Sequence, residues 1–325
     1  MVDFIEATRR YVANRLTGKP LYVSIEITQA CNADCGFCGY RRSNDNESRI
    51  PKGIGSYLPI ILELNPIGLG YVGGEPLIRD DLEKLVIEAK SARVPYVQVT
   101  TNGSKLTPDR YFSLSDAEID RLQISLDFPD PRHDEERGIP GLFDKITNFL
   151  QATKERRRTR IGINTILMNE NIEDVRKILQ LAQEYEVSVN LLPYNSVRNG
   201  GHNHAIIPSR VNEKFLSRLK EDYGSVIDNP SAVIPCMETF MEEGGYGKCD
   251  AGKSFLWVLP NGRILACIDH PSSEGDTLEE VKSFMDKNDC NRCLASCRSI
   301  SEAATSKNPL ILLRLARDLS SNIIS

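Results

Sequence analysis

Three cysteines stand close together in the segment CNADCGFC. Cys31, Cys35 and Cys38 are spaced C-x3-C-x2-C, and a loop of this length can bring three thiolates to different iron atoms of one iron–sulfur cube. Such a cluster ordinarily takes four cysteines, so one iron is left for a ligand that is not protein. A structural zinc site would need four ligands closed around the metal, and no histidine or fourth cysteine stands near this loop. The segment therefore indicates an iron–sulfur cluster with one open coordination position.

Glycines and polar residues follow the next apolar runs at the points where those runs end. The segment after the run at 67–72 consists of Gly73, Gly74, Glu75 and Pro76. Glycines let a backbone approach a ligand closely, although a GGEP segment by itself could be a tight turn. Two later runs end on or near Asn102, Ser125 and Asp127, and Asn164 lies within the run at 161–167. Because parallel strands present their carboxyl ends at one mouth, we expect these side chains to gather around a ligand there.

Together these segments resemble the radical S-adenosylmethionine (radical SAM) superfamily, whose signature is a C-x3-C-x-aromatic-C loop after the first barrel strand. Phe37 supplies the aromatic residue. The resemblance implies that the open iron of a 4Fe-4S cluster is chelated by SAM, which one electron cleaves to a 5'-deoxyadenosyl radical. It also implies that the GGEP segment binds the SAM amino group. The polar residues at the ends of the later runs would then lie around the ribose and carboxylate of SAM.

The elements that must position these residues alternate along the chain. Branched and aromatic runs predict six strands at 21–27, 67–72, 96–101, 122–126, 161–167 and 187–192, and helical periodicity appears at 80–92, 141–157 and 171–185. Strands separated by helices imply parallel pairing with right-handed crossovers. We therefore expect an α/β fold with the partial (β/α)6 TIM-like barrel that radical SAM proteins share. An amphipathic helix at 4–16, with Arg9, Arg10 and Arg15 largely off its apolar face, is expected to cap the barrel.

A second group of cysteines follows at Cys249, Cys267, Cys290 and Cys293. Cys249 and Cys267 flank a predicted hairpin that turns near Gly262, which can bring them together. Four thiolates suit an iron–sulfur cluster or zinc equally well, so spacing alone does not identify the metal. The C-x12-G-x4-C element resembles the opening of a SPASM domain, and the shorter pattern here resembles its truncated form, Twitch. The stretch from His133 to Phe143, H-D-x2-R-G-x2-G-x-F, resembles one in SPASM-type enzymes. This resemblance implies an auxiliary 4Fe-4S cluster in a small C-terminal domain.

Two further cysteines, Cys236 and Cys297, are left over. Each could be a buried thiol without chemistry, since cysteine is often buried. Cys297 could replace one of the four ligands, and all six C-terminal cysteines could hold two clusters. By resemblance to radical SAM epimerases, either thiol could instead be a catalytic hydrogen-atom donor.

Composition limits the classes of partner. The net charge is −5 and the pI about 5.6, so no global basic field attracts nucleic acid. The first residues lack the apolar core of a signal peptide, and no apolar run approaches the roughly 20 residues that span a bilayer. The nine cysteines fall in metal-ligand spacings that suit a reducing compartment, so we expect a cytoplasmic protein. The resemblance implies a flavodoxin- or ferredoxin-type electron donor, and peripheral membrane contact is not the favoured interpretation.

We expect four regions: an N-terminal helix at 1–18, the core barrel at 19–200, a linker helix at 201–240 and the auxiliary-cluster domain at 241–325. The function predicted is hydrogen abstraction from a ribosomal peptide or a small natural-product metabolite, leading to oxidation, epimerisation or cross-linking. A faint resemblance of YVANRLTGKP to radical SAM enzymes of hopanoid synthesis adds an isoprenoid or lipid substrate as an alternative. An alternative of another class is a non-catalytic iron–sulfur or zinc protein. The sequence does not identify the substrate or the oligomeric state.

Overall fold

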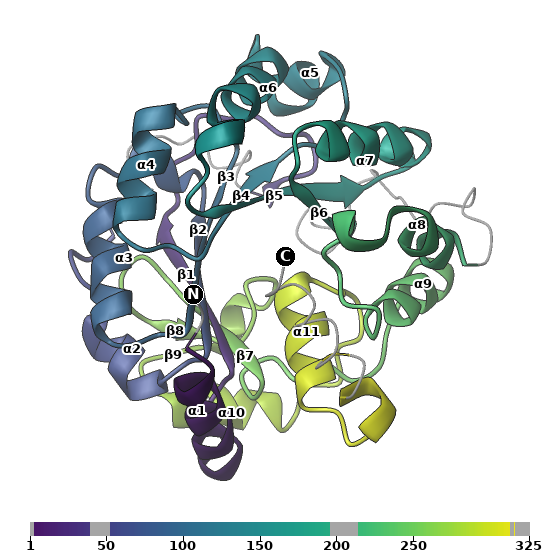
Figure 1. The fold of residues 1–325 in the computed structure, drawn as a ribbon. Helices are drawn as coiled ribbons and strands as arrows, with labels where there is room; N and C mark the ends of the chain where they lie inside the picture. The colour runs from purple at the N-terminus through teal and green to yellow at the C-terminus, as the bar shows by residue number, and fades with distance from the viewer. Residues whose placement is uncertain (1–2, 40–52, 196–213, 313–314, 316–325) are drawn as a thin grey trace.

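The computed structural model describes residues 3–39, 53–195, 214–312 and 315. Within them one curved sheet surrounds a central space, and helices cover its outer side (Figure 1). The first six strands are parallel and lie in chain order: β1 Tyr22–Thr28, β2 Gly68–Gly73, β3 Tyr96–Thr101, β4 Arg121–Ser125, β5 Arg160–Leu167 and β6 Ser188–Pro193. Each matches a strand that the sequence predicts, with ends displaced by at most one residue. The α/β barrel expected from the sequence is confirmed.

The helices between the strands bury their apolar faces against the sheet. They are α2 Leu58–Leu64, α3 Leu82–Ser91, α4 Pro108–Asp116, α5 Arg132–Arg137, α6 Leu142–Thr153 and α7 Val175–Glu184. In α7 the apolar residues recur at helical spacing, and Val175, Ile178 and Leu179 are fully buried. The sheet contributes alternate residues such as Val97 and Val99 to the same core. The core therefore lies between sheet and helices, and the strand ends are left to form the mouth.

The C-terminal segment continues the barrel sheet instead of forming a separate one. Strand β7 (Phe255–Val258) pairs in parallel with β1, and β8 (Ile264–Leu265) and β9 (Glu274–Gly275) follow antiparallel, which gives the order β6-β5-β4-β3-β2-β1-β7-β8-β9. The predicted hairpin is present as β7 and β8. Its Gly262 has a φ of 87°, a left-handed conformation that glycine adopts without steric cost.

Four more helices follow β6: α8 Phe215–Tyr223, α9 Ile234–Glu243, α10 Leu278–Met285 and α11 Ser296–Ala304. Helices α8 and α9 pack together beside β6, whereas α10 packs against β8 and β9. Helix α11 lies against β1 and β7, and its Ser296 Oγ is 3.2 Å from the amide nitrogen of Asn190 on β6. It thus connects the two sides of the open barrel (Figure 1). Most of the predicted boundary segment at 195–204 lies outside the described residues.

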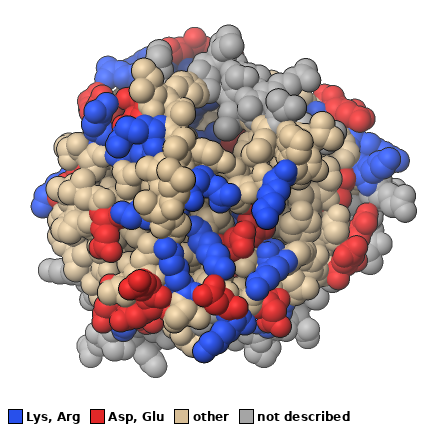
Figure 2. Space-filling model, turned by 90° about the horizontal axis from the view of Figure 1, so that it is seen from below, with Lys and Arg blue, Asp and Glu red and all other residues tan. Residues whose placement is uncertain are grey.

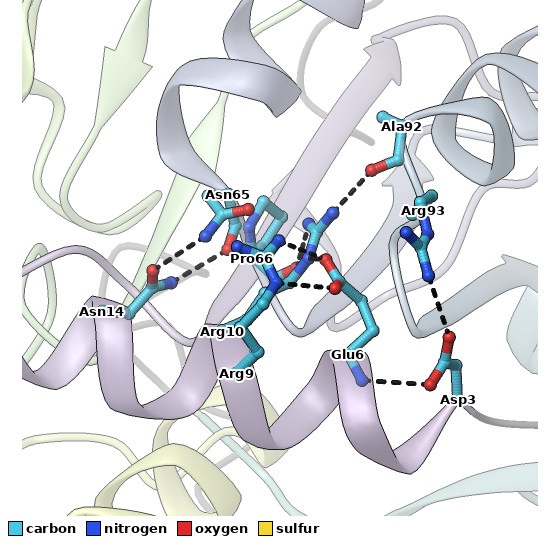
Figure 3. Close-up of polar contacts among 9 residues, drawn as sticks. All are labelled: Asp3, Glu6, Arg9, Arg10, Asn14, Asn65, Pro66, Ala92 and Arg93. Carbon is cyan, nitrogen blue, oxygen red and sulfur yellow. Dashed lines mark hydrogen bonds and ion pairs between the residues drawn. The ribbon is translucent and has the colours of Figure 1, made fainter.

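Helix α1 (Phe4–Thr17) lies across the loops that lead into the first three strands. It begins at Asp3, whose carboxylate accepts a hydrogen bond from the Glu6 amide, and it ends at Gly18 in a left-handed conformation. It packs through its polar residues Glu6, Arg10 and Asn14, which are buried (Figure 3). Arg10 lies off the apolar face, as the sequence pattern predicts, but the structure buries this polar side and exposes the apolar one.

Candidate functional site

The cysteine loop leaves the carboxyl end of β1 and lies at the barrel mouth. Cys35 is buried, Cys38 half-buried and Cys31 exposed. Burial is the main cause that raises the pKa of Cys35 to about 11, and the charges of Cys38 and Cys31 add to the rise. The three sulfurs therefore lie near enough to affect one another, as a shared cluster requires.

A positive charge and an apolar wall adjoin Cys35. Arg137 on α5 is buried, its Nη1 lies 3.6 Å from the Cys35 sulfur, and its guanidinium lies 5.1 Å from the centre of the Phe37 ring. This charge opposes the rise in the Cys35 pKa. The same small core contains Phe128, Met168 and Tyr194. The apolar neighbours keep water from this sulfur, and Arg137 offsets part of the cost that burial imposes on its thiolate, the form that binds iron.

Asp127 holds Arg137 in place. It is completely buried, one carboxylate oxygen pairs with Arg137 Nη2, and the other accepts the Ile166 amide at 2.9 Å. The Arg137 carbonyl in turn accepts the Asp34 amide at 2.8 Å, inside the cysteine loop. This connection fixes the loop to α5. The sequence predicts a SAM contact for Asp127, and in the described structure both of its carboxylate oxygens have protein partners.

His133, at the start of the H-D-x2-R-G segment, has a local structural contact. Its Nδ1 accepts the backbone N–H of Asp127 at 3.2 Å, and the side chain is fully buried. Burial lowers the pKa of His133 well below its usual value, and the nearby Arg137 charge lowers it further. The imidazole is therefore neutral at physiological pH and holds the end of β4 against α5.

The GGEP turn is bonded directly to the residues before the cysteine loop. The amides of Gly74 and Glu75 donate to the carbonyls of Thr28 and Ala30, both at 2.8 Å. A Cβ on Gly74 would lie 2.1 Å from the Ala30 oxygen, so no side chain fits at this position. Pro76 then opens a short 3-10 helix, Pro76–Ile78. Gly73 and Gly74 thus let β2 approach the cysteine loop.

Glu75 points into the protein and its carboxylate is almost fully bonded. Oε1 accepts from the Leu77 amide at 3.0 Å and from Thr101 Oγ1 at 2.6 Å, while Oε2 accepts the Asn102 amide at 2.7 Å. Burial raises the pKa of Glu75, and these hydrogen bonds oppose the rise. A carboxylate can accept about four hydrogen bonds, so Oε2 retains capacity for one further donor. The side chain is fixed and can orient an amino group.

Other predicted residues occupy different surroundings. Asn102 donates from Nδ2 to Asn32 Oδ1 at 3.0 Å and so contacts the cysteine loop. Ser125 is paired in register with Asn164 across β4 and β5, and the Asn164 Oδ1 accepts from Asn190 at 3.0 Å. Sequence reasoning assigned no contact to Asn32 or to Arg137. Arg137 belonged to a noted motif, whereas nothing in the local pattern distinguished Asn32.

The C-terminal cysteines form a second group. The Cys249 amide donates to the Cys290 carbonyl at 3.0 Å. Burial is the main cause that raises the pKa of Cys249 to about 12 and also raises that of Cys267, and the charge of Cys293 adds to both. The charge of Cys290 adds to the raised pKa of Cys293. These four thiols therefore lie near one another.

The two remaining thiols have different neighbours. The Cys236 sulfur on α9 accepts a hydrogen bond from the Tyr246 hydroxyl at 2.9 Å. The charge of Cys297 on α11 contributes to the raised pKa of Tyr22 on β1, after burial and Tyr96, so this thiol lies toward the barrel strand. Within the described ranges no three His, Cys, Asp or Glu side chains are close enough to hold one ion. Cluster cysteines bind different irons, so they stand farther apart than the ligands of a single ion.

Comparison with known proteins identifies relatives over most of the chain. A model of the radical SAM superfamily matches residues 25–182. The chain is 30% identical over 290 residues to the AdoMet-dependent heme synthase of Methanosarcina barkeri. This match covers 82% of this chain and 81% of the heme synthase. It is 28% identical over 172 residues to a probable GTP 3',8-cyclase of Metallosphaera sedula, a match that spans 51% of this chain and only about half (53%) of the cyclase.

The fold also resembles a solved enzyme. SuiB of Streptococcus suis, bound to its precursor peptide SuiA, superposes with a TM-score of 0.62 at 18% identity, over 94% of this chain and 78% of SuiB. A second structure of SuiB is bound to S-adenosylmethionine. At this identity the likeness concerns the fold. None of the helices in the described part of this chain is both long and apolar enough to cross a membrane.

Proposed function

Because the chain belongs to the radical SAM superfamily, we propose that it is a SPASM/Twitch-type member with two 4Fe-4S clusters that oxidises a peptide or a small metabolite. The observation that carries the proposal is the second group of thiols, Cys249, Cys267, Cys290 and Cys293, gathered beside strands that continue the barrel sheet. Family membership makes the chain an enzyme, and the alternative of a non-catalytic iron–sulfur or zinc protein is set aside.

The residues at the mouth fit the SAM-binding cluster. Cys31, Cys35 and Cys38 supply three thiolates of the kind that iron–sulfur clusters take. Arg137 places a cation beside Cys35, which offsets the cost of a buried thiolate. Phe37 and its apolar neighbours keep water away from that side. When bound, the cluster and SAM supply one-electron chemistry that generates a radical able to remove an unactivated hydrogen.

The chain's own residues orient SAM and guard the mouth. We infer that Glu75 positions the turn that meets the SAM amino group, because its buried carboxylate fixes this turn through Leu77, Thr101 and Asn102. Gly73, Gly74 and Pro76 hold Glu75 in position from the same turn. Asn102, Ser125 and Asn164 are the proposed neutral contacts to the rest of SAM, and Asp127 supports them by fixing Arg137.

Oxidation is preferred to epimerisation because of where the extra cysteines lie. An epimerase needs a thiol that returns a hydrogen atom to the substrate. The Cys236 sulfur already accepts from Tyr246, and Cys297 lies near Tyr22 on β1. Tyr22 is the first residue of β1, whereas the cysteine loop follows the last residue of that strand, so Cys297 lies toward the strand end away from the SAM site. Epimerisation predicts a product of unchanged mass in H2O that gains one deuterium in D2O, whereas oxidation predicts a product lighter by two hydrogens.

Two substrate classes have specific support. SuiB, whose fold this chain shares, binds a precursor peptide, which favours a ribosomal peptide. The heme synthase is 30% identical over 82% of this chain, which favours a heme precursor as the second candidate. A flavodoxin or ferredoxin is the proposed electron donor. Incubation of the reduced enzyme with each substrate class, followed by mass spectrometry of the products, separates these candidates.

The deciding experiment counts clusters. After anaerobic reconstitution, iron and sulfide are measured for wild type, for Cys31→Ala/Cys35→Ala/Cys38→Ala and for Cys249→Ala/Cys267→Ala. Two 4Fe-4S clusters predict about eight irons in wild type and about four in each variant. 5'-Deoxyadenosine formation with dithionite and SAM should vanish only in the triple variant. Cys236→Ala is the matched control and should keep all the iron. About four irons in wild type, with zinc alongside, would contradict the auxiliary cluster.

A further inference from the structure

Helix α1 presents its apolar residues to solvent and its polar residues to the protein. Ile5 and Leu16 are 85% and 82% exposed, and Phe4 and Val12 are about half exposed at 51% and 52%. Ile5, Val12 and Leu16 recur at spacings of seven and four residues, so they form one stripe along the outer face. Arg9, whose side chain is 62% exposed and pairs with Glu6, lies among them on the same face. Isolated exposed apolar residues are ordinary, but three large ones on one face of a helix call for a covering surface.

The inward polar face is tightly built, so the orientation of α1 is fixed. Glu6 accepts from both Arg9 and Arg10, and Arg10 Nη1 donates to the Pro66 carbonyl at 2.9 Å. The Asn14 amide donates to the carbonyls of Pro20 and Asn65 at 2.8 and 3.0 Å (Figure 3). Rotation of the helix to bury its apolar stripe would break these bonds and leave buried polar groups unpaired.

Cations adjoin the stripe. A groove of about 360 Å³ runs beside the end of α1 and is lined by Arg15, Lys19, Lys253 and Lys282, with Asp250 and Asp286 as its acidic residues. Lys253 pairs with Asp286 at 3.2 Å, which leaves three cations and one carboxylate, a net excess of two positive charges. Figure 2, seen from the side on which α1 and α10 lie, shows Lys and Arg side chains gathered across the middle of the face. The chain as a whole has a net charge of −5, so this local excess is not a general property.

We propose that α1 and this cationic groove dock the enzyme on an anionic lipid surface. An interfacial helix binds through an apolar stripe at the headgroup boundary together with basic residues that meet anionic headgroups, and both features are present here. Phe4, Ile5, Val12 and Leu16 would enter the boundary, while Arg15, Lys19 and Lys282 would contact the headgroups. This docking does not rest on the proposed reaction.

Two other occupants fit less well. In a symmetric pair of α1 helices the apolar residues would meet, but a parallel pair would also bring each Arg15 toward its own copy, and neither arrangement supplies anionic partners for the lysines of the groove. An acidic electron donor would match the charge. However, α1 lies at the amino ends of β1, β2 and β3, whereas the cysteine loop follows the carboxyl end of β1, so the donor would bind at the wrong end of the barrel. The lipid surface is therefore the occupant that the structure favours.

The test is co-sedimentation of the full-length protein with vesicles of phosphatidylcholine containing phosphatidylglycerol, and with vesicles of phosphatidylcholine alone. Wild type should bind the anionic vesicles and be released by salt. Ile5→Ser/Leu16→Ser should weaken binding about tenfold or more, and Arg15→Glu/Lys282→Glu should abolish it. Leu62→Ser/Ile87→Ser alters exposed apolar residues of α2 and α3, at 59% and 56% exposure, and is the matched control that should bind as wild type does.

Each variant is first tested for folding by circular dichroism. Failure of wild type to bind the anionic vesicles overturns the proposal, as does equal loss in the control pair. Sedimentation velocity without lipid tests whether a second copy of the chain binds the apolar face of α1. If wild type is a dimer that Ile5→Ser/Leu16→Ser converts to a monomer, a second copy covers the stripe and the proposal is wrong.

Discussion

The carboxylates of the mouth are fully buried, and each is bonded inside the chain. Glu75 and Asp127 have no exposed surface, and both oxygens of each accept at least one hydrogen bond or ion pair. Loss of these partners would leave a buried charge unpaired and would strongly destabilise the folded protein. Their partners are the amides and side chains that surround the cysteine loop, so these residues hold the mouth in shape before any ligand arrives. Preorganisation of this kind reduces the ordering that binding must otherwise cause.

Glu75→Gln should weaken SAM binding by about tenfold or more, because the hydrogen bonds that its charged carboxylate accepts, each worth about 1.5–3 kcal/mol, hold the turn beside the SAM site in position. The amide would also turn its NH2 toward the Asn102 amide, which now donates to Oε2 at 2.7 Å. Two donors would then face each other, and we expect a loss of about 1–3 kcal/mol in the free energy of unfolding. Equilibrium dialysis of SAM against the reconstituted protein, with urea unfolding alongside, measures both.

Thr101→Val provides the control, because it removes one hydrogen bond to Oε1 and leaves the carboxylate charge. It should lose about 1 kcal/mol of stability and keep most of its SAM affinity. Equal SAM affinity in Glu75→Gln and wild type would remove Glu75 from the SAM site.

At the scale of single elements, α1 depends on an acid held among guanidinium groups. The hydrogen bond from Arg9 is the main cause that lowers the pKa of Glu6 to about 2, with Arg10 adding to it and burial opposing it. The folded-state pKa lies below the unfolded value, so the stabilisation is complete above pH 4.5 and is lost as pH falls toward about 2. Glu6→Gln should therefore be less stable than wild type at neutral pH, by about 1–2 kcal/mol.

The difference between Glu6→Gln and wild type should shrink through this acid range and be gone at about pH 2, and urea unfolding at several pH values measures it. Glu184→Gln, at an exposed position on α7, should follow wild type throughout. A Glu6→Gln defect of the same size at all pH values would contradict the assignment of the pKa shift to this carboxylate.

The sequence predicts some elements better than others, for physical reasons. The six barrel strands are continuous branched runs bounded by turns, and this signal is local. Helix α4 was not predicted, although Thr107 and Pro108 form a typical helix start, because among its residues only Tyr111 and Leu114 are buried. The sequence also could not predict which side of α1 packs against the protein. Its polar partners at Pro66 and Ala92 come from loops more than fifty residues away.

The site shows the same division between local and distant signals. Cysteine spacing and the GGEP segment are local, so the sequence located both. The role of Arg137 depends on Cys35, which is 102 residues away, and on Asp127 at the end of another element. Such a contact exists only once the barrel has closed. Strands β1 and β7 are also far apart in the sequence, so no local pattern indicates that they pair. For this reason the sequence predicts a separate C-terminal domain.

At the scale of the whole molecule, Arg298 connects the two loops that carry the second cysteine group. It is completely buried and donates to the carbonyls of Tyr246, Gly247 and Cys293. It also pairs at 2.9 Å with Glu302, whose same oxygen accepts the Asp250 amide. One side chain therefore holds the segment around Cys249 against the segment around Cys293.

Arg298→Met should lose the C-terminal metal site and keep the one at the mouth, because it leaves buried carbonyls and the Glu302 carboxylate unpaired, at a cost of about 3–5 kcal/mol. Iron should fall from about eight to about four per chain while 5'-deoxyadenosine formation persists. Arg292→Met, at an exposed position in the same cysteine loop, is the matched control and should keep full iron. Full iron in Arg298→Met would show that the cysteines assemble without this residue.

The C-terminal segment shares one core and one sheet with the barrel, which predicts a single unfolding transition. Four residue pairs join β1 to β7, and the apolar core includes Leu256, Val281 and Leu294 together with barrel residues. Trp257 on β7 is the only tryptophan, so its fluorescence reports this strand, whereas far-UV circular dichroism is dominated by the barrel helices. The two signals should change at the same temperature.

Leu256→Ala should cost about 2–5 kcal/mol and lower both midpoints together by several degrees, whereas Leu62→Ala at an exposed position should lower neither. A fluorescence transition that precedes the loss of helical signal would mean that the segment unfolds on its own, and the auxiliary cysteines would then belong to an independent domain.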